Sequence, residues 1–372
     1  MSEPVTVAEI DLAAIAHNLR AIREKVVPAR VMAVVKCNAY GHGLRPVVQL
    51  AWARGVRHFG VARLEEGEAV RAIQPEAAVL VFGGFLPEQV AGYLQADLEF
   101  TLFDLERARL LSAKAREFGA TARVHVKVDT GMGRVGVPWR EAADFVVRVR
   151  DLEALEVRGL YTHFAESDHS DKAYTHTQLE RFNRVLAELS RRRVEIPLTH
   201  AANSGAILDL PESYFDLVRA GVSLYGYYPS RQTSESLSLR PAMRLKSRVL
   251  AVRKAAEGTY VSYGRTHRTS RATRLATVAV GYGDGYNRLL SNRGEVLIRG
   301  RRRPVVGRVC MDQIVVDVGP DDRVAVGDEV VLLGRQGNEQ ISIYEICEKL
   351  NTIPYEVTTW VAERVPRVYL DA

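Results

Sequence analysis

The chain has 372 residues, of which 47% are hydrophobic and 26% charged, and its formal net charge is +6. These values are typical of a globular protein of about two domains and exclude a disordered, collagen-like or coiled-coil chain. No run approaches the roughly 18 apolar residues that a membrane helix needs, and the first residues lack a signal-peptide pattern, so we expect a cytoplasmic protein without membrane contact. Three scattered cysteines predict neither a disulfide framework nor a metal site.

Short β-rich runs alternate with amphipathic stretches from the N-terminus to about residue 225. Helices are expected between the runs, for example over residues 104–118 and 174–192, and one helix from about Asp11 precedes the first run. Strands separated by helices pair in parallel, and eight such units over roughly 200 residues predict a TIM (β/α)8 barrel. The eight predicted strands are residues 31–36, 58–62, 78–82, 98–102, 123–128, 158–162, 198–201 and 215–218.

The polar segment SRQTSESLSLRP, residues 230–241, separates this region from one of different character. Beyond it, glycine-rich turns separate β-rich runs, and one helix is expected near residues 341–350. The predicted strands there are residues 244–253, 274–280, 295–298, 303–318 and 329–333. We therefore predict an α/β chain with a TIM-barrel domain over residues 1–235 and a smaller, mainly β domain over residues 236–372.

Two arginine-rich runs, at residues 191–193 and 299–303, have the charge of a nucleic-acid footprint. No recognisable nucleic-acid module accompanies them. Loop runs of this kind are more often solvated surface, so we predict that the protein does not bind nucleic acid.

The segment VMAVVKCNAYGHG, residues 31–43, carries an apolar strand that ends in Lys36 and runs into a loop with Tyr40 and His42. A residue that ends a barrel strand faces the catalytic rim. Lys36 either extends its ammonium group to solvent or lies partly desolvated. Desolvation lowers a lysine pKa from about 10.4 and favours Schiff-base chemistry. The loop that follows suits an anionic cofactor group.

Polar residues also follow later barrel strands. His163 comes after GLYT, the segment THAANS holds His200, Asn203 and Ser204, and Arg219 follows YFDLV. A single histidine after a strand is more often structural than catalytic. Several polar residues at successive strand ends indicate one site.

With these residues in place, the chain resembles the bacterial, fold-type III, pyridoxal phosphate-dependent alanine racemases over nearly its whole length. The sequence departs from the family at Cys37, where a small residue such as alanine is commoner, and at Ala220, where proline is usual. The resemblance implies a cofactor-binding barrel, a β domain that contributes to the partner's active site, and a head-to-tail homodimer. It rests on nine blocks in the family's order: AVVKCNAYGHG, KVDTGMGRVG, YTHFAESD, HAANSGA, VRAGVSLYG, VSYGRTH, VAVGYGDGY, GRVCMDQ and PYEV.

The resemblance implies that the cofactor is pyridoxal 5'-phosphate and that Lys36 holds it as an aldimine. Neutral hydroxyl and N–H donors would bind its phosphate. Those donors are Tyr40, Ser204, the backbone around Gly221, and Tyr355, and the remaining cofactor-site residues are His163, His200, Asn203 and Arg219.

Racemisation removes the α-proton of an amino acid on one face and returns a proton on the other, so two bases suffice. The resemblance assigns these roles to Lys36 and to Tyr263 of the partner subunit. It also places His163, which is itself linked to Arg219 and His200, beside that tyrosine. Arg219 would face the pyridine nitrogen. Because an arginine donates and does not readily accept a proton, that nitrogen stays unprotonated, and the weak electron sink limits side reactions.

The substrate, a small amino acid, would be recognised through its carboxylate by Arg134 and by the backbone near Met311 of the partner subunit. Lys127 matches a lysine that some family members carry as a carbamate beside this arginine. Tyr282 and Tyr286 match tyrosines that narrow the entrance, which favours a methyl side chain. The role could be D-alanine supply for the cell wall or L-alanine breakdown.

Four alternatives stay open from the sequence. Gly131, Gly133 and Gly136 spell G-x-G-x-x-G, which suggests a nicotinamide-dependent dehydrogenase, although the motif does not open a helix in the first βα unit. A metal-dependent hydrolase would bind its metal through the histidines and aspartates of one polar loop, although these residues lack the regular spacing of a metal site on a helix. A non-catalytic pyridoxal phosphate carrier would lack the β domain. A racemase of broader specificity would accept serine or larger amino acids. The polar loop contains His163, Asp168, His169 and Asp171.

Overall fold

The computed structural model describes residues 4–320 and 323–371. It divides into two compact units. The first, called the barrel unit below, is Ala14–Arg240. The second, called the β unit, contains the described residues up to Ala13 together with those from Pro241 onward.

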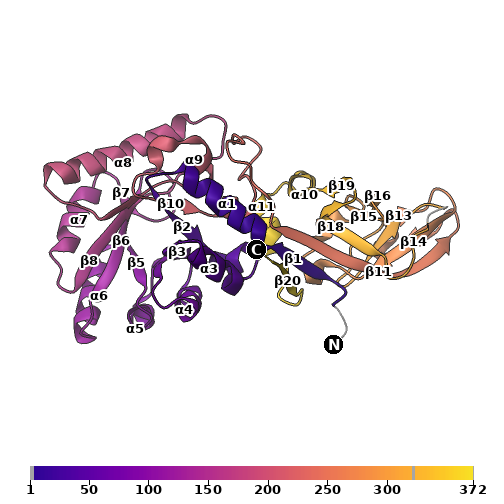
Figure 1. Cartoon of the computed structure of the whole chain (residues 1–372), viewed down its shortest axis with the longest axis horizontal. Coiled ribbons are helices and arrows are strands. Elements are labelled where there is room, and N and C mark those ends of the chain that lie inside the picture. The colour runs from indigo at the N-terminus through magenta and orange to yellow at the C-terminus, as the bar shows by residue number, and fades with distance from the viewer. Residues whose placement is uncertain (1–3, 321–322, 372) are drawn as a thin grey trace. The chain divides into compact units, whose positions relative to one another are not determined.

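Eight parallel strands form a nearly closed barrel in the first unit, in the order β10-β2-β3-β4-β5-β6-β8-β9 (Figure 1). The seam between β9 and β10 is joined by backbone hydrogen bonds, from Asp216 N–H to Thr199 O at 3.0 Å and from Arg219 N–H to Ala202 O at 2.9 Å. All eight predicted strands and the barrel are confirmed. The strands are β2 (Arg30–Val34), β3 (His58–Val61), β4 (Ala78–Val81), β5 (Glu99–Leu102), β6 (Ala122–Asp129), β8 (Leu155–Tyr161), β9 (Leu198–His200) and β10 (Leu217–Ala220).

Helices cover the outside of this sheet (Figure 1). They form where one face is apolar, as in α6, whose inner face buries Ala108, Leu111 and Ala115 and whose first turn is capped by Asp104 accepting from Arg107 N–H at 2.8 Å. The helices are α1 (Leu12–Lys25), α3 (Leu44–Ala53), α4 (Leu64–Ile73), α5 (Val90–Gln95), α6 (Leu105–Glu117), α7 (Ala142–Arg150), α8 (Ala173–Arg191) and α9 (Ser204–Asp209), with a short α2 (Lys36–Tyr40) and a short strand β7 (Val137–Pro138).

The barrel interior has an apolar layer and a polar one. Met32, Leu80, Tyr161 and Leu217 pack together in the apolar cluster. Charged and imidazole side chains fill a second set of buried interior positions, at Glu99, His125, His200 and Arg219. This polar content is the feature of the barrel that bears on function.

The second unit is mainly β. Its large sheet has the order β16-β15-β18-β11-β1-β20, while β14 and β17 extend it from β11, and β19 pairs with β18. The strands are β1 (Val7–Asp11), β11 (Met243–Ala255), β14 (Thr273–Val278), β15 (Glu295–Ile298), β16 (Arg301–Pro304), β17 (Ile314–Asp317), β18 (Glu329–Gln336), β19 (Glu339–Ile341) and β20 (Arg367–Leu370), beside a hairpin of β12 (Tyr260–Val261) and β13 (His267–Arg268) and two helices, α10 (Ile343–Leu350) and α11 (Pro354–Thr359).

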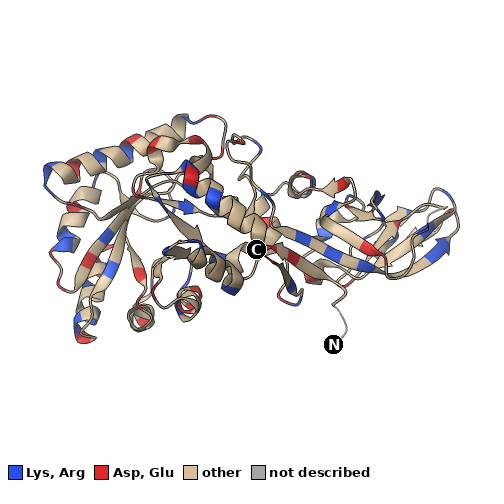
Figure 2. Cartoon of the chain, in the orientation of Figure 1, with Lys and Arg blue, Asp and Glu red and all other residues tan. Residues whose placement is uncertain are grey.

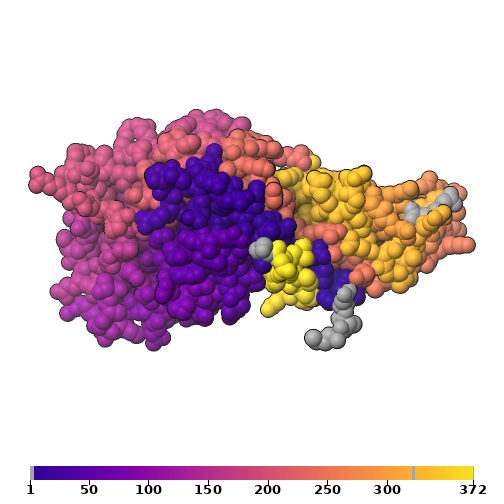
Figure 3. Space-filling model, in the orientation of Figure 1, coloured from indigo at the N-terminus to yellow at the C-terminus, as the bar shows by residue number. Residues whose placement is uncertain are grey.

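Two features of the β unit differ from the sequence-based expectation. The run 303–318, predicted as one strand, forms two, because the chain turns at Gly307, whose φ of +77° is left-handed. The strand β1 was not predicted. It pairs antiparallel with β11 and parallel with β20, so the indigo of β1 and the yellow of β20 lie side by side in Figure 3. The β unit therefore combines the described residues up to Ala13 with those after Arg240, whereas the sequence suggested a single boundary near residue 235.

The arginine-rich runs are engaged in ion pairs. Arg192 pairs with Glu188 at 2.7 Å and with Asp144 at 2.6 Å, and Arg302 pairs with Glu345 at 2.7 Å. Figure 2 shows charges of both signs interspersed along α8. Within the part of the chain that the structure describes, no helix is both long enough and apolar enough to cross a bilayer.

Candidate active site

Lys36 begins an unusual turn directly after β2. The four residues that follow it are all left-handed, a conformation that disfavours a residue other than glycine by roughly 1–2 kcal/mol and that seldom recurs in series. The structure therefore holds this segment in a strained shape at the carboxyl end of the barrel, where such strain is often functional. The φ angles are 52° at Cys37, 52° at Asn38, 54° at Ala39 and 53° at Tyr40.

The buried His42 supports this turn. Its Nδ1 lies 3.1 Å from the carbonyl of Ala39 and 2.9 Å from that of Tyr40, and its ring stacks on Tyr225 at 4.5 Å between centroids. The Tyr225 hydroxyl in turn donates to the carbonyl of Val34 in β2 at 2.9 Å. The turn is thus fixed to the strand that precedes it, and the position of Lys36 is fixed with it.

The environment of Lys36 favours a neutral amine. Burial lowers the pKa of Lys36, and the positive charge of Arg134 lowers it further, while Cys37 and Glu66 act in the opposite direction. A neutral amine is the nucleophilic form of lysine. The predicted role of Lys36 in carbonyl chemistry is therefore compatible with its surroundings.

A small cup of donors lies where Tyr40, Ser204 and Gly221 converge. A Cβ added at Gly221 would lie 2.8 Å from the Tyr40 hydroxyl and 3.6 Å from Ser204 Oγ, so glycine lets the backbone approach both hydroxyls closely. Ser204 Oγ accepts from the N–H groups of Gly221 at 3.1 Å and Ser223 at 3.2 Å. Hydroxyl and backbone N–H groups gathered around a gap are suited to a phosphate group.

Arg219, at the end of β10, is only 4% exposed and is held by several acceptors. Its Nη1 lies 2.9 Å from His200 Nδ1, and its Nη2 lies 3.2 Å from His163 Nδ1. Nη2 also donates to the carbonyls of Thr162 and Ala201, each at 2.8 Å. Among residues 4–320 and 323–371, the Nε–H of Arg219 has no hydrogen-bond partner, so this donor is available to a ligand.

Five of the predicted residues share one electrostatic environment. Burial and the charge of Arg219 hold the pKa of His163 well below its ordinary value, with Lys127, Arg134 and Lys36 acting in the same direction. Burial, and then Arg134 and Arg219, lower the pKa of Lys127 to about 8. The structure thus brings these five side chains together around one positively charged region, which suits anionic ligands.

The glycine-rich segment that follows β6 binds a carboxylate of its own chain. Asp129 Oδ1 accepts from the N–H groups of Gly131 and Met132 at 2.9 Å and of Gly133 at 3.2 Å. The next helix, α7, begins only at Ala142. The segment is therefore a loop that presents Arg134 and lacks the strand-to-helix turn of a dinucleotide site.

Asn203 has a local structural contact. Its Oδ1 accepts from Ala206 N–H at 3.1 Å, which caps α9, and from the Ser167 hydroxyl at 2.6 Å. Asn203 thereby joins the loop after β8 to the helix that carries Ser204.

The remaining predicted residues lie in the β unit, and several line one hollow there. Tyr263 is 73% exposed, Met311 53% and Tyr282 43%. The backbone around them is closely coupled, since Tyr282 N–H donates to the carbonyl of Cys310 at 2.9 Å and Gly283 N–H to that of Met311 at 2.9 Å. The hollow also contains Arg288 and Arg308. Its side chains include two phenols, a thioether and two guanidinium groups.

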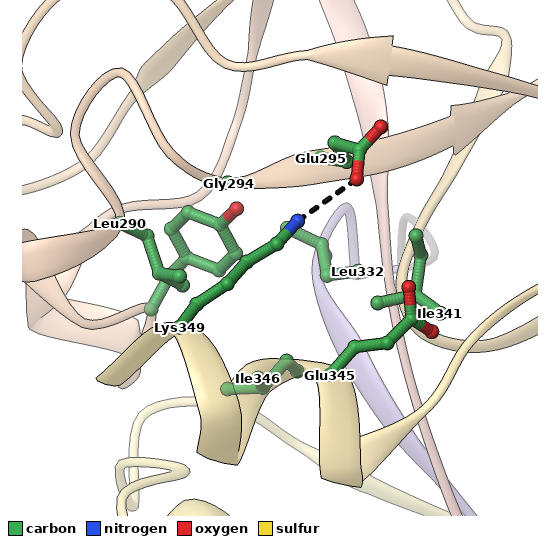
Figure 4. Close-up of a pocket in the computed structure, with 9 residues that line it drawn as sticks. Leu290, Gly294, Glu295, Leu332, Ile341, Glu345, Ile346 and Lys349 are labelled. Carbon is green, nitrogen blue, oxygen red and sulfur yellow. Dashed lines mark hydrogen bonds and ion pairs between the residues drawn. The ribbon is translucent and has the colours of Figure 1, made fainter. Parts of the chain in front are cut away.

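Tyr286 lies elsewhere in the β unit. It is 4% exposed and lines a small interior pocket, drawn in Figure 4, whose rim includes the Lys349–Glu295 ion pair at 2.8 Å. Within the described residues, its hydroxyl has no hydrogen-bond partner. The structure does not bring Tyr286 into the hollow with Tyr282. Tyr355 lies half-buried on α11 and is not among the residues that line the hollow.

Sequence reasoning missed two buried interior residues, Glu99 and His125. They occur in the strand sequences EFTL and RVHVKVD, where a polar residue is usually expected to face away from the barrel interior. The alternation of side chains along β6 could have identified His125, because it places this residue on the same face as Lys127. The polar loop at residues 163–171 was considered for a metal. No group of three or more metal-ligating side chains occurs in the described ranges.

Comparison with known proteins gives consistent matches over the whole chain. The family model described as alanine racemase, N-terminal domain, matches residues 10–229, and that described as alanine racemase, C-terminal domain, matches residues 242–369. An alanine racemase of Desulforamulus reducens is 45% identical over 373 residues and is covered over 100% of both chains.

Solved structures agree. The alanine racemase of Clostridium difficile 630 has a TM-score of 0.95 and 35% identity, with 100% of this chain and 97% of that chain covered. The alanine racemase of Bartonella henselae, solved with covalently bound pyridoxal phosphate, has a TM-score of 0.90 and 29% identity, with 99% of this chain and 100% of that chain covered.

Proposed function

The chain belongs to the alanine racemase family, and from this premise we propose that it is a pyridoxal phosphate-dependent isomerase that interconverts L-alanine and D-alanine. The single observation that supports this chemistry best is the arrangement around Lys36. A partly buried amine with a lowered pKa lies four residues before Tyr40, one of the hydroxyl donors of the cup, and shares a cationic environment with Arg134 and Arg219.

The residues fit the cofactor. The cup of Tyr40, Ser204 and Gly221 suits the phosphate, because a Cβ at Gly221 would fill the space that a phosphate oxygen needs. The free Nε–H of Arg219 suits the unprotonated ring nitrogen of the cofactor, since a guanidinium donates and does not accept. Tyr355 is proposed as a further phosphate donor. When bound, pyridoxal phosphate supplies an electron-withdrawing ring that makes the α-proton of an attached amino acid acidic.

The chain's own residues then bind the substrate and move the proton. Lys36, once its amine is free, takes or gives the α-proton on one face. Arg134 binds the substrate carboxylate through its planar guanidinium. Because burial and Arg219 keep His163 neutral, that imidazole contributes an uncharged hydrogen-bonding group beside the second base. Burial, and then Arg134 and Arg219, lower the pKa of Lys127 to about 8, which raises the fraction of neutral amine that can be carbamylated, and as a carbamate Lys127 would orient Arg134.

We assign the opposite face to Tyr263 of the partner subunit. The phenol is 73% exposed in a hollow of the β unit, and a base must be shielded from water to act on a weak carbon acid. A head-to-tail homodimer would cover that hollow, with Met311 contributing its backbone and Tyr282 narrowing the entrance. A two-base reaction follows, with one proton carrier on each side of the substrate.

Reduction of the cofactor linkage tests the central assignment. The purified protein is expected to be yellow, and borohydride should fix the cofactor on the peptide that contains Lys36. Both alanine enantiomers should be racemised, and serine, lysine and arginine, assayed in parallel, define the specificity. A cofactor fixed on another peptide, or no turnover of either alanine enantiomer, contradicts the proposal.

Mixing two inactive variants tests the shared site. Lys36→Ala and Tyr263→Ala are each expected to be inactive, but dimers reassociated from an equal mixture should recover about a quarter of wild-type activity, because half are mixed and each of these has one intact site. The lone Lys36→Ala variant, reassociated with itself, is the control. A mixture that stays inactive would show that both residues act within one subunit.

A further inference from the structure

A chain of buried polar side chains runs through the barrel interior behind Arg219. Nη1 of Arg219 lies 2.9 Å from Nδ1 of His200, and Nε2 of His200 lies 2.9 Å from Nδ1 of His125. Nε2 of His125 lies 3.1 Å from Oε2 of Glu99. None of the four residues is more than 4% exposed. They are called the relay below.

The two ends of the relay fix the direction of every hydrogen bond in it. A guanidinium only donates hydrogen bonds and an ionised carboxylate only accepts them. A neutral imidazole donates from one ring nitrogen and accepts at the other. Arg219 therefore donates to Nδ1 of His200, which leaves the proton of His200 on Nε2. His200 then donates to His125, and His125 donates from Nε2 to Glu99. One arrangement, with both imidazoles neutral and protonated at Nε2, satisfies all three contacts.

The charges in the barrel support this arrangement. Burial and the charge of Arg219 hold the pKa of His200 well below its ordinary value, so His200 is neutral. Burial alone would raise the pKa of Glu99, but the hydrogen bond from His125 and the nearby positive charge of Arg123 lower it. Glu99 is therefore ionised.

The barrel makes room for the relay. A Cβ at Gly159, on the neighbouring β8, would lie 2.1 Å from Nδ1 of His125, so a residue larger than glycine would displace the imidazole. The ring of His200 stacks on Tyr161 at 4.7 Å between centroids with 4° between planes. Both imidazoles are thus fixed in position by β8.

The relay also provides a negative charge that offsets the buried positive charge of Arg219. In the part of the chain that the structure describes, no Asp or Glu oxygen forms an ion pair with Arg219, although this guanidinium is buried. Buried charges are stabilised by charged or hydrogen-bonded partners. Glu99 supplies the opposite charge through two polarisable imidazoles.

We propose that His125 and Glu99 are positioning residues for racemisation. They hold His200 in the tautomer whose Nδ1 accepts from Arg219, and this keeps the guanidinium oriented with its Nε–H toward the ligand. A buried carboxylate beneath a catalytic imidazole fixes the tautomer in the same way in serine proteases. The inference rests on the proposed function only for the role of Arg219, and the relay itself is a property of the protein alone.

Nitrogen-15 NMR of the imidazoles tests the relay independently of activity. Long-range proton–nitrogen spectra of histidine-labelled wild-type protein, with and without cofactor, report which ring nitrogen carries the proton. His200 and His125 are both expected to carry it on Nε2 in both forms. A proton on Nδ1 of His200, or a charged imidazole at either position, would overturn the inference even if the enzyme racemises alanine.

Matched variants test the effect on the reaction. His125→Leu removes the acceptor that His200 needs and should lower kcat by about ten- to a hundredfold, a range typical of groups that orient a functional residue, with KM near wild type. His125→Asn keeps an acceptor at the Nδ1 position and should restore most of kcat and the wild-type His200 tautomer. Glu99→Gln removes the charge and should lower kcat by about tenfold.

Ser112→Ala is the control, since Ser112 is buried on α6 and donates to the carbonyl of Glu153 at 2.7 Å without belonging to the relay. It should lose stability yet keep kcat and the His200 tautomer. Equal kinetics in His125→Leu and wild type would overturn the role of His125, and wild-type kcat in Glu99→Gln would overturn that of Glu99. If wild-type protein neither binds the cofactor nor racemises alanine, the proposed function fails while the NMR result still decides the relay.

Discussion

Alanine in place of Gly159 is expected to destabilise the protein by about 3 kcal/mol. The new Cβ would lie 2.1 Å from Nδ1 of His125, 2.5 Å from Cε1 and 2.8 Å from Cγ, so three ring atoms come closer than carbon atoms pack. The ring is held at both ends, by His200 at 2.9 Å and by Glu99 at 3.1 Å, and it cannot tilt without breaking one contact. Overpacking accounts for about 1–3 kcal/mol and a buried donor left unpaired for a similar amount.

Urea unfolding followed by far-UV circular dichroism, at one fixed protein concentration, measures this free energy. The decisive comparison is a double-mutant cycle with His125→Ala. Without the imidazole the new methyl has room, and Gly159→Ala should then change stability by less than about 1 kcal/mol. The coupling energy between the two positions should be about 2 kcal/mol. Additive effects of the two substitutions would refute the steric argument, because they would show that the ring does not occupy this space.

Three further predictions follow from burial and charge. The folded-state pKa of Lys127 is about 8, below its unfolded value, so in CO2-free buffer the unfolded chain binds the extra proton between about pH 8 and 10.5, and this residue should make stability rise with pH by up to about 3 kcal/mol. Lys127→Met should reduce the rise, and equal profiles in the variant and wild type would contradict the shift. Tyr286→Phe removes a buried hydroxyl that lacks a partner and should leave the melting temperature unchanged or higher, with KM for alanine unchanged, whereas a raised KM would show that Tyr286 does line the entrance. Arg134→Lys loses two-pronged carboxylate binding and should raise KM for alanine about tenfold, measured by initial rates in both directions, while an unchanged KM would place the carboxylate elsewhere.

The barrel could be predicted because each of its strands is a short apolar run bounded by helical periodicity. Both signals, the apolar run and the helical periodicity, lie within short stretches of sequence. The apolar run arises because a strand of a parallel barrel is buried on both faces of the sheet. The strand β1 could not be found in this way. Its five residues acquire partners only from β11 and β20, which lie more than two hundred residues further along the chain, and no local pattern encodes such a pairing.

The site was predictable in its residue types but not in its detailed geometry. Lys36 and Arg219 stand at strand ends, where chain order alone places them on one rim. The left-handed turn after Lys36 has no sequence signal, since among Cys37, Asn38 and Ala39 only asparagine commonly adopts that conformation. It exists because His42 and Tyr225 hold it in the folded barrel.

The parallel pairing of β1 with β20 has a consequence for the order in which the protein is made. A ribosome releases the first strand long before its neighbours exist, and domains tend to fold as they emerge. The barrel segment, complete by Arg240, can therefore acquire its shape while β1 waits unpaired. Residues 7–11 gain their first neighbour when β11 is made and their second, β20, only when synthesis is almost finished. We therefore expect the β1–β20 pair to form last and to be exposed to chaperones and proteases in the nascent chain.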